Sequence, residues 1–142
     1  MPPPDLMPIG LDLTRTHKLV SQAFDAALAE AGATRPVWLT LLSIKSSTTA
    51  IQREHAAAIG IQGPTLTHHL NALETQGLLV RRRDPANRRV HQIELTEAGE
   101  ALFLRLRETA LAFDRQLRAG LSENDLRKFG SLLAALRGNV GE

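Results

Sequence analysis

The sequence predicts a mainly α-helical protein that carries one small β-hairpin. Apolar residues recur every three or four positions through most of the 142 residues, which is the spacing of one face of a helix. Residues 77–96 instead carry strand-type residues on either side of Asp84-Pro85-Ala86-Asn87, a run of turn formers, and residues 90–95 alternate between the two faces of a strand. We therefore expect helices before and after a single two-stranded hairpin.

A proline-rich arm and an amphipathic helix are expected at the N-terminus. Four of the first eight residues are proline, so we predict a flexible arm over residues 1–10 and a single domain over residues 11–142. A helix is predicted over residues 11–31, ended by Gly32. Its apolar face comprises Leu13, His17, Val20, Phe24, Ala27 and Ala31. Thr34 can cap a second, largely buried helix that begins near Pro36.

Two short helices follow in a helix-turn-helix pattern. The first is Ala-rich, covers residues 52–60 and ends at Gly60. The second covers residues 64–76, begins at Pro64 after a tight connection, and ends before Gly77. Its inner face comprises Leu66, Leu70 and Leu73. Other helical hairpins share this pattern, so it does not by itself establish DNA binding.

The predicted hairpin is strongly basic. Its strands cover residues 78–83 and 89–95, and the segment 77–96 carries five arginines against Asp84 and Glu94. That segment has a net charge of +3, whereas the whole chain has +2. Because a basic hairpin directly after a helix-turn-helix forms a winged helix-turn-helix, we place this unit at about residues 35–96.

Two long helices are expected after the hairpin. Thr96 can cap the first, which has an apolar stripe at helical spacing and is broken by Gly120. Ser122 can cap the second, with Glu123 and Asp125 in its first turn, and Gly138 ends it. The two stripes comprise Leu102, Leu106, Ala110, Phe113 and Leu117, then Leu126, Phe129, Leu133 and Leu136.

The helix over residues 64–76 has short polar side chains near its start, and Glu74 is its one acid. Such side chains can reach base edges in a major groove, although an ordinary solvated face has the same pattern. The hairpin favours DNA binding, because its arginines are expected at a projecting tip with too few nearby acids to neutralise them.

The combined motifs resemble the MarR (multiple antibiotic resistance regulator) family of transcription factors. The matching pieces are IG-x-x-x-P-T-L-T, L-x-x-L-E-x-x-G-L-L-x-R, D-P-x-x-R-R and x-L-T-x-A-G, and the likeness covers nearly the whole chain after the arm. The resemblance implies a regulator, which we expect to be a repressor, binding pseudo-palindromic duplex DNA as a homodimer. The helices at about 11–31 and 97–138 would then form the dimer.

The resemblance also implies which residues contact DNA. In the family an arginine of the wing tip enters the minor groove, and Arg89 matches that position. Asn87 stands where the family usually has an aspartate that holds this arginine, and His68 where it often has an arginine that reads bases. The predicted DNA-binding residues are Gln62, Gly63, Thr65, Thr67, His68, His69, Asn71, Arg81, Arg83, Asn87, Arg88 and Arg89.

Many family members release DNA when a small aromatic or lipophilic ligand binds between the dimer helices and the DNA-binding lobe. The residues predicted near such a pocket are His17, Phe24, Trp38 and Leu42, which could equally be plain core residues.

A metal-responsive regulator is an alternative because the chain has five histidines. Adjacent histidines on a helix point about 100° apart, however, so we expect no metal site and no cofactor.

Other classes of protein are disfavoured. The chain has no cysteine, which excludes disulfides, thiol catalysis and thiolate metal sites. It has no apolar run near the ~20 residues of a membrane span, and its N-terminus does not resemble a signal peptide, so we expect a cytoplasmic protein. No phosphate loop, nucleophile elbow or cluster of acids and histidines indicates an enzyme. An architectural DNA-binding protein without effector remains the main alternative.

Overall fold

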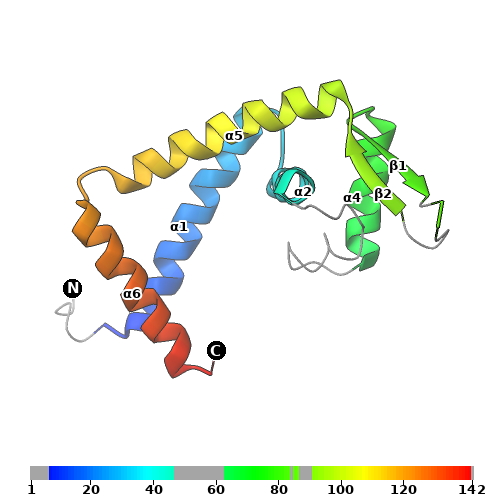
Figure 1. Cartoon of the computed structure of the whole chain (residues 1–142). Helices are drawn as coiled ribbons and strands as arrows, with labels where there is room; N and C mark the ends of the chain where they lie inside the picture. The colour runs from blue at the N-terminus through cyan, green and yellow to red at the C-terminus, as the bar shows by residue number, and fades with distance from the viewer. Residues whose placement is uncertain (1–6, 47–62, 84, 87–90, 142) are drawn as a thin grey trace. The chain divides into compact units, whose positions relative to one another are not determined.

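The computed structural model describes residues 7–46, 63–83, 85–86 and 91–141. Within these ranges the chain forms five helices and a two-stranded hairpin (Figure 1), which confirms the predicted mainly α-helical class. The elements are α1 (Ile9–Glu30), α2 (Arg35–Ser46), α4 (Gly63–Thr75), β1 (Leu79–Arg83), β2 (His91–Leu95), α5 (Glu97–Arg118) and α6 (Glu123–Asn139). The helix predicted over residues 52–60 and most of the proline-rich arm lie outside the described residues.

The chain divides into two compact units, residues 1–110 and residues 111–142. The boundary falls inside α5, so the first unit contains α1, α2, α4, the hairpin and the first part of α5. The second unit contains the end of α5 and α6. None of the helices in the described part of the chain is both long and apolar enough to cross a membrane.

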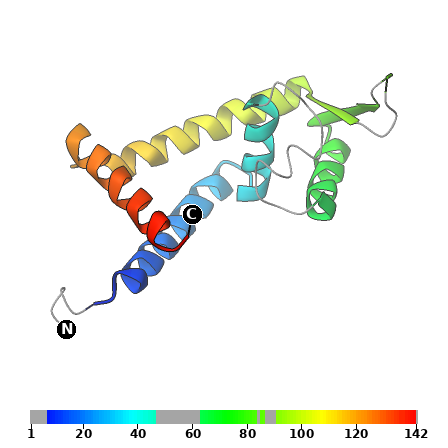
Figure 2. The ribbon, with the colours of Figure 1, turned by 60° about the horizontal axis from the view of Figure 1, so that its bottom comes forward.

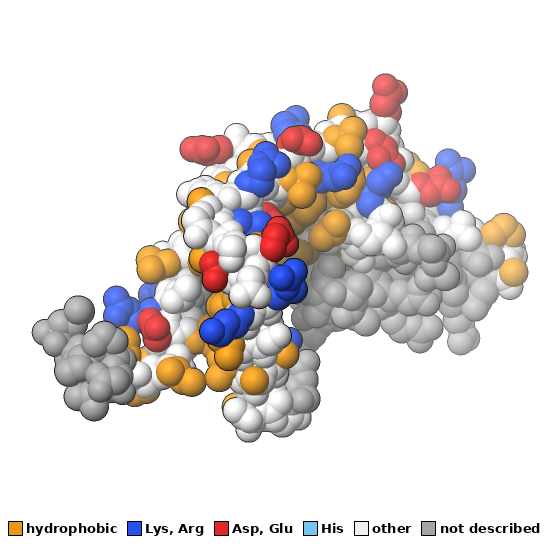
Figure 3. All heavy atoms as spheres, turned by 60° about the vertical axis from the view of Figure 1, so that its left-hand side comes forward, with side chains coloured by type: hydrophobic (Ala, Val, Ile, Leu, Met, Phe, Trp, Pro, Cys, Tyr) orange, Lys and Arg blue, Asp and Glu red, His pale blue; other side chains and the backbone are white. Residues whose placement is uncertain are grey.

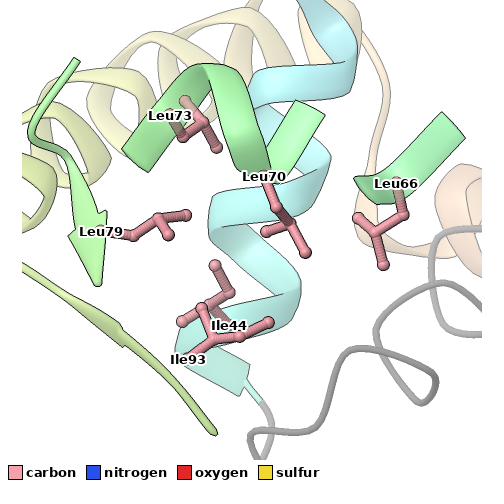
Figure 4. Close-up of a cluster of buried hydrophobic side chains, with 6 residues drawn as sticks. All are labelled: Ile44, Leu66, Leu70, Leu73, Leu79 and Ile93. Carbon is pink, nitrogen blue, oxygen red and sulfur yellow. The ribbon is translucent and has the colours of Figure 1, made fainter. Parts of the chain in front are cut away.

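One hydrophobic cluster joins α4 to the hairpin. Its six side chains come from α2, α4 and both strands, and they point toward one another in Figure 4. They are Ile44, Leu66, Leu70, Leu73, Leu79 and Ile93. The predicted inner face of α4 is confirmed, since its leucines at spacings of four and three all belong to this cluster. Their common burial holds α4 beside the hairpin, as Figures 1 and 2 show.

A second cluster joins α1, α2 and the start of α5. It comprises Leu28, Trp38, Leu41, Leu102, Phe103 and Leu106. The rings of Trp38 and Phe103 stack, with centroids 5.8 Å apart and planes inclined by 15°. Lys45 lies over Phe103 and binds Glu100 at 2.9 Å. Because α2 contributes to both clusters, it ties the helix-and-hairpin lobe to α1 and α5.

The hairpin is antiparallel and its register is set by buried residues. Leu79 pairs with Leu95, Arg81 with Ile93, and Arg83 with His91. The alternation predicted for the second strand is confirmed, because Ile93 is buried and Leu95 half-buried while Gln92 and Glu94 are exposed. Directly opposed residues share a face of the sheet, so Arg81 lies on the inner face with Ile93.

Thr96 fastens the start of α5 to the connection between α4 and β1. Its hydroxyl donates to the Gly77 carbonyl at 2.6 Å and accepts from the Gly99 amide at 3.1 Å, which confirms the predicted cap. Its own amide donates to the Leu78 carbonyl at 3.1 Å. A Cβ at Gly99 would lie only 1.9 Å from that same oxygen, so this approach requires glycine.

The helix α1 begins at Ile9, two residues before the predicted start, and only its second half packs within the first unit. Leu13 and His17, expected on the inner face, are exposed, whereas Phe24 is half-buried and Leu28 fully buried. The reason is that the second cluster includes side chains of α1 only from Phe24 onward. The apolar spacing continues beyond the part of α1 that this cluster covers.

In the second unit, α6 begins with the predicted Ser122 cap, which forms a capping box with Asp125. Ser122 Oγ accepts from the Asp125 amide at 3.0 Å, and Asp125 Oδ2 accepts from the Ser122 amide at 2.9 Å. None of the α6 residues described is buried in the single chain. Phe129 and Leu132 are 55% and 56% exposed.

Candidate nucleic-acid interface

One side of α4 is exposed and carries short side chains. Since the leucines of this helix face the core, Thr65, His68 and Asn71 lie along the opposite side. Thr67 and His69, also predicted to contact DNA, are half-buried. The rings of His68 and His69 are tilted by 58° with centroids 5.8 Å apart. The exposed side therefore carries no Lys, Arg, Asp or Glu near its start, and Glu74 is the only acid of the helix.

The described arginines of the hairpin differ in their surroundings. Arg82 is 69% exposed and lies 3.5 Å from the Glu94 carboxylate. Arg83, at the end of β1, is exposed, and no residue in the described ranges pairs with it. Arg81 is only 17% exposed. Arg81 and Arg82 therefore each pair with a carboxylate, whereas Arg83 is exposed; Arg88 and Arg89 lie outside the described residues, so the prediction that the acids are too few to neutralise the whole cluster stays a prediction.

Arg81 is bound to α4 rather than directed away from the lobe. Its Nη2 donates to Asn71 Oδ1 in a short hydrogen bond and to Glu74 Oε1 at 3.1 Å. Its backbone amide donates to the other oxygen of Glu74, Oε2, also at 3.1 Å. The carboxylate of Glu74 therefore receives both a main-chain and a side-chain donor from the same residue of β1.

Sequence reasoning missed this link although the signal for it was present. Strand periodicity places Arg81 on the same face as Leu79, which is a core position. A cation on an inward face requires a partner, and Glu74 lies seven residues earlier, across a tight connection. Asn71 lies one turn before Glu74 on the same helix and completes the pair of acceptors.

Four predicted DNA-binding residues, Gln62, Asn87, Arg88 and Arg89, lie outside the described residues. Gly63 is the first residue of α4.

The residues predicted near an effector separate into two groups. Phe24 and Trp38 both belong to the second hydrophobic cluster, where Trp38 is 7% exposed. His17 is exposed on α1, with Nδ1 3.4 Å from Ser21 Oγ, and Leu42 is exposed on α2. The single chain thus brings Phe24 and Trp38 together, while His17 and Leu42 stay at its surface.

Metal ligands are not gathered in the part of the chain that the structure describes. Within residues 7–46, 63–83, 85–86 and 91–141, no three His, Asp or Glu side chains lie close enough to hold one ion.

Comparison with known proteins identifies the family. The sequence profile of the MarR family matches residues 33–91. The chain is 30% identical to a structure described as the transcriptional repressor CouR bound to a 23-mer DNA duplex, with 92% of each chain covered and a TM-score of 0.80. The chain belongs to the MarR family. The solved MarR regulators share its fold, so the predicted winged helix-turn-helix class is confirmed. We call α4 the recognition helix and the β1–β2 hairpin the wing, the parts that the sequence predicted for these positions.

Other MarR proteins are similar over nearly the whole chain. CouR from Rhodococcus jostii RHA1, described as bound to p-coumaroyl-CoA, is 26% identical, with 90% of each chain covered and a TM-score of 0.75. The transcriptional regulator SlyA is 25% identical, covering 91% of this chain and 94% of its own, with a TM-score of 0.78. The family and the fold are those of transcription regulators rather than of enzymes.

Proposed function

We propose that this MarR protein is a repressor that binds pseudo-palindromic duplex DNA as a homodimer. Each recognition helix would enter a major groove and each wing would follow the adjacent backbone into the minor groove. The observation that carries this proposal is the shared core of α4 and the wing, which holds an acid-poor helix face beside a strand of arginines. Because such a regulator must reach chromosomal DNA, we propose that the protein is cytoplasmic.

The charges of the lobe support DNA as the partner. A carboxylate on a recognition helix would repel phosphate, but Glu74 is paired with Arg81 and so is locally neutralised. Thr65 and His68 have side chains short enough to reach base edges, and Arg83 is exposed to meet a phosphate. We assign further contacts to Gln62, Gly63, Thr67, His69, Asn87, Arg88 and Arg89, with Arg89 in the minor groove. The proposal does not depend on Asn71 and Arg81 contacting DNA, because they are bound to each other.

Exposed apolar side chains support the homodimer. Large aliphatic and aromatic residues on α1, the second half of α5 and α6 are at least 42% exposed in the single chain. They include Ile9, Leu11, Leu13, Leu19, Leu111, Leu117, Phe129 and Leu132. Hydrophobic side chains are accordingly visible on the surface in Figure 3. Exposed apolar surface of this kind marks an interface, and a second copy with the same helices would cover it.

An aromatic or lipophilic effector is part of the proposal. CouR from Rhodococcus jostii RHA1 is described as bound to p-coumaroyl-CoA, a thioester with an aromatic ring. In this chain Phe24 and Trp38 would offer aromatic surface, and His17 and Leu42 lie exposed on the same two helices, α1 and α2. Trp38 is the only tryptophan, so quenching of its fluorescence by aromatic acids and their thioesters measures ligand binding directly.

The experiment that tests the proposal compares two duplexes over a series of salt concentrations. One is the DNA immediately upstream of the gene for this protein, and the other is a scrambled duplex of the same composition. A specific regulator should bind the first at least about 1,000-fold more tightly, with affinity falling by about 0.9 log units per log unit of salt for each phosphate neutralised. Equal affinity for both duplexes would indicate an architectural protein instead, and binding to neither would refute DNA binding.

A further inference from the structure

The wing and the recognition helix are joined by a polar link as well as by their core. Arg81 on β1 contacts two residues of α4 that lie about one helical turn apart, Asn71 and Glu74. The main chain of β1 takes part too, through the amide of Arg81 and Glu74 Oε2. On β1, Leu79 is the last residue of the shared core, and Arg81 lies two residues further along the same face, opposite Ile93.

The surroundings of Arg81 differ from those of an arginine that binds phosphate. Its side chain is only 17% exposed, and its Nη2 is engaged by two acceptors on α4. Its charge is matched by the Glu74 carboxylate at 3.1 Å. Arg83, two residues along the same strand, is exposed and has no partner among the described residues. The two arginines carry the same charge on the same strand and have opposite environments.

We propose that Arg81 is a positioning residue that fixes the orientation of the wing on the recognition helix, and that Asn71 is its tether rather than a reader of bases. The inference rests on the proposed function, since it concerns how the same lobe meets DNA. Guanidinium suits this role because its planar fork presents several donors in fixed directions, so it can hold an amide oxygen and a carboxylate at once.

The physical consequence is an effect on affinity that does not require a contact between Arg81 and a phosphate. The helix and the wing contact different grooves, so both must be correctly placed in the same molecule for full binding. If the link is broken, only a fraction of molecules holds the wing in that position. The apparent Kd then rises by the inverse of that fraction.

The test uses the full-length protein and the upstream duplex, with the variants Arg81→Gln, Asn71→Ala and their combination. Arg83→Gln serves as the matched control, because it removes the same charge two residues away. We expect Arg81→Gln and Asn71→Ala each to raise Kd about tenfold, which corresponds to about a tenth of molecules remaining competent. The double variant should be no weaker than either single variant, because both break one link.

The salt dependence separates positioning from phosphate binding. Arg81→Gln should leave the slope of log affinity against log salt unchanged, whereas Arg83→Gln should reduce its magnitude by about 0.9 for each phosphate that the variant no longer neutralises. A reduced slope for Arg81→Gln, together with an effect that adds fully to that of Asn71→Ala, would overturn the inference.

A second variant covers the case in which Arg81→Gln fails to fold. Arg81→Lys keeps the charge and loses the fork, so a positioning role predicts a Kd close to that of Asn71→Ala. Affinity restored to the wild-type value by lysine would instead show a simple charge contact and would contradict the inference. If the wild-type protein binds no duplex, the proposed function fails separately. A double-mutant cycle between Arg81 and Glu74 on thermal unfolding then decides whether the link exists: coupling supports it, and full additivity refutes it.

Discussion

Gly99 is the residue at which a single added methyl group should disturb the fold most. An alanine Cβ there would lie 1.9 Å from the carbonyl oxygen of Leu78, 3.0 Å from its carbonyl carbon and 3.4 Å from Leu95 Cβ. The nearest atom belongs to the main chain, so no side-chain rotation can relieve the clash. The start of α5 must therefore move away from the connection between α4 and β1.

The magnitude follows from what that movement breaks. Overpacking costs about 2 kcal/mol. The shift also strains the bonds from Thr96 to the carbonyls of Gly77 and Leu78, at about 1 kcal/mol each. Alanine recovers about 1 kcal/mol, because it favours helix over glycine. We therefore expect Gly99→Ala to lower the free energy of unfolding by about 3 kcal/mol, which corresponds to a fall in Tm of about 10 °C.

The assay is urea or thermal unfolding of the full-length protein at one fixed protomer concentration, since dimerisation makes apparent stability depend on concentration. Gly138→Ala is the control. Gly138 lies in α6, and an added Cβ there meets no atom within 4 Å. Its replacement should be neutral or stabilising by at most about 1 kcal/mol. If Gly99→Ala is as stable as Gly138→Ala, the close approach of α5 to Leu78 is not a feature of the folded protein.

Three further predictions concern the interface and the dimer. Arg89→Ala should weaken binding to the upstream duplex about tenfold or more and change the free energy of unfolding by less than about 0.5 kcal/mol; unaltered affinity would remove Arg89 from the wing contact. His68→Ala should change the preferred half-site in a selection from randomised duplexes more than it changes overall affinity, and a uniform loss across sequences would argue against base reading. Replacing both Phe129 and Leu132 by aspartate should give a monomer by analytical ultracentrifugation, because each is exposed in the single chain and would be buried as a charge in the dimer; a dimer that persists would place the interface elsewhere.

The sequence predicted those parts of the structure that depend on local patterns. The period of α4 identified Leu66, Leu70 and Leu73 as its inner face, and strand alternation did the same for Ile93. The cap at Thr96 was predictable because a threonine directly before a helical stripe has one common role. These features need only neighbouring residues and the knowledge that one face is buried.

Features that depend on distant residues were not predictable in the same way. Gly99 lies inside a helix, and only the approach of Leu78 explains why it has no side chain. The apolar spacing of α1 did not indicate that Leu13 remains uncovered in one chain, because periodicity identifies a face and not the partner that covers it. The stacking of Trp38 on Phe103 joins two residues far apart in the chain, a separation that no local pattern spans.

The site itself was predicted in outline and misjudged in one detail. An arginine-rich wing beside a helix with short side chains was expected, and the structure has both. The net charge of the hairpin, however, does not distinguish the surroundings of its individual arginines. Arg81 and Arg83 lie on the same face of β1, but Arg81 binds Asn71 and Glu74 of α4, whereas Arg83, at the end of the strand, is exposed.

The most direct test of dimeric DNA binding is a hydroxyl-radical footprint of the full-length protein on its upstream duplex. Two copies of the helix-and-wing lobe, joined as a dimer, should protect two half-sites related by a dyad and centred about 10 base pairs apart on one face of the DNA. Additional protection should lie in the minor groove on either outer side, where the wings would be. A single protected half-site, or protection without a dyad, would contradict the claim that two lobes act on one duplex.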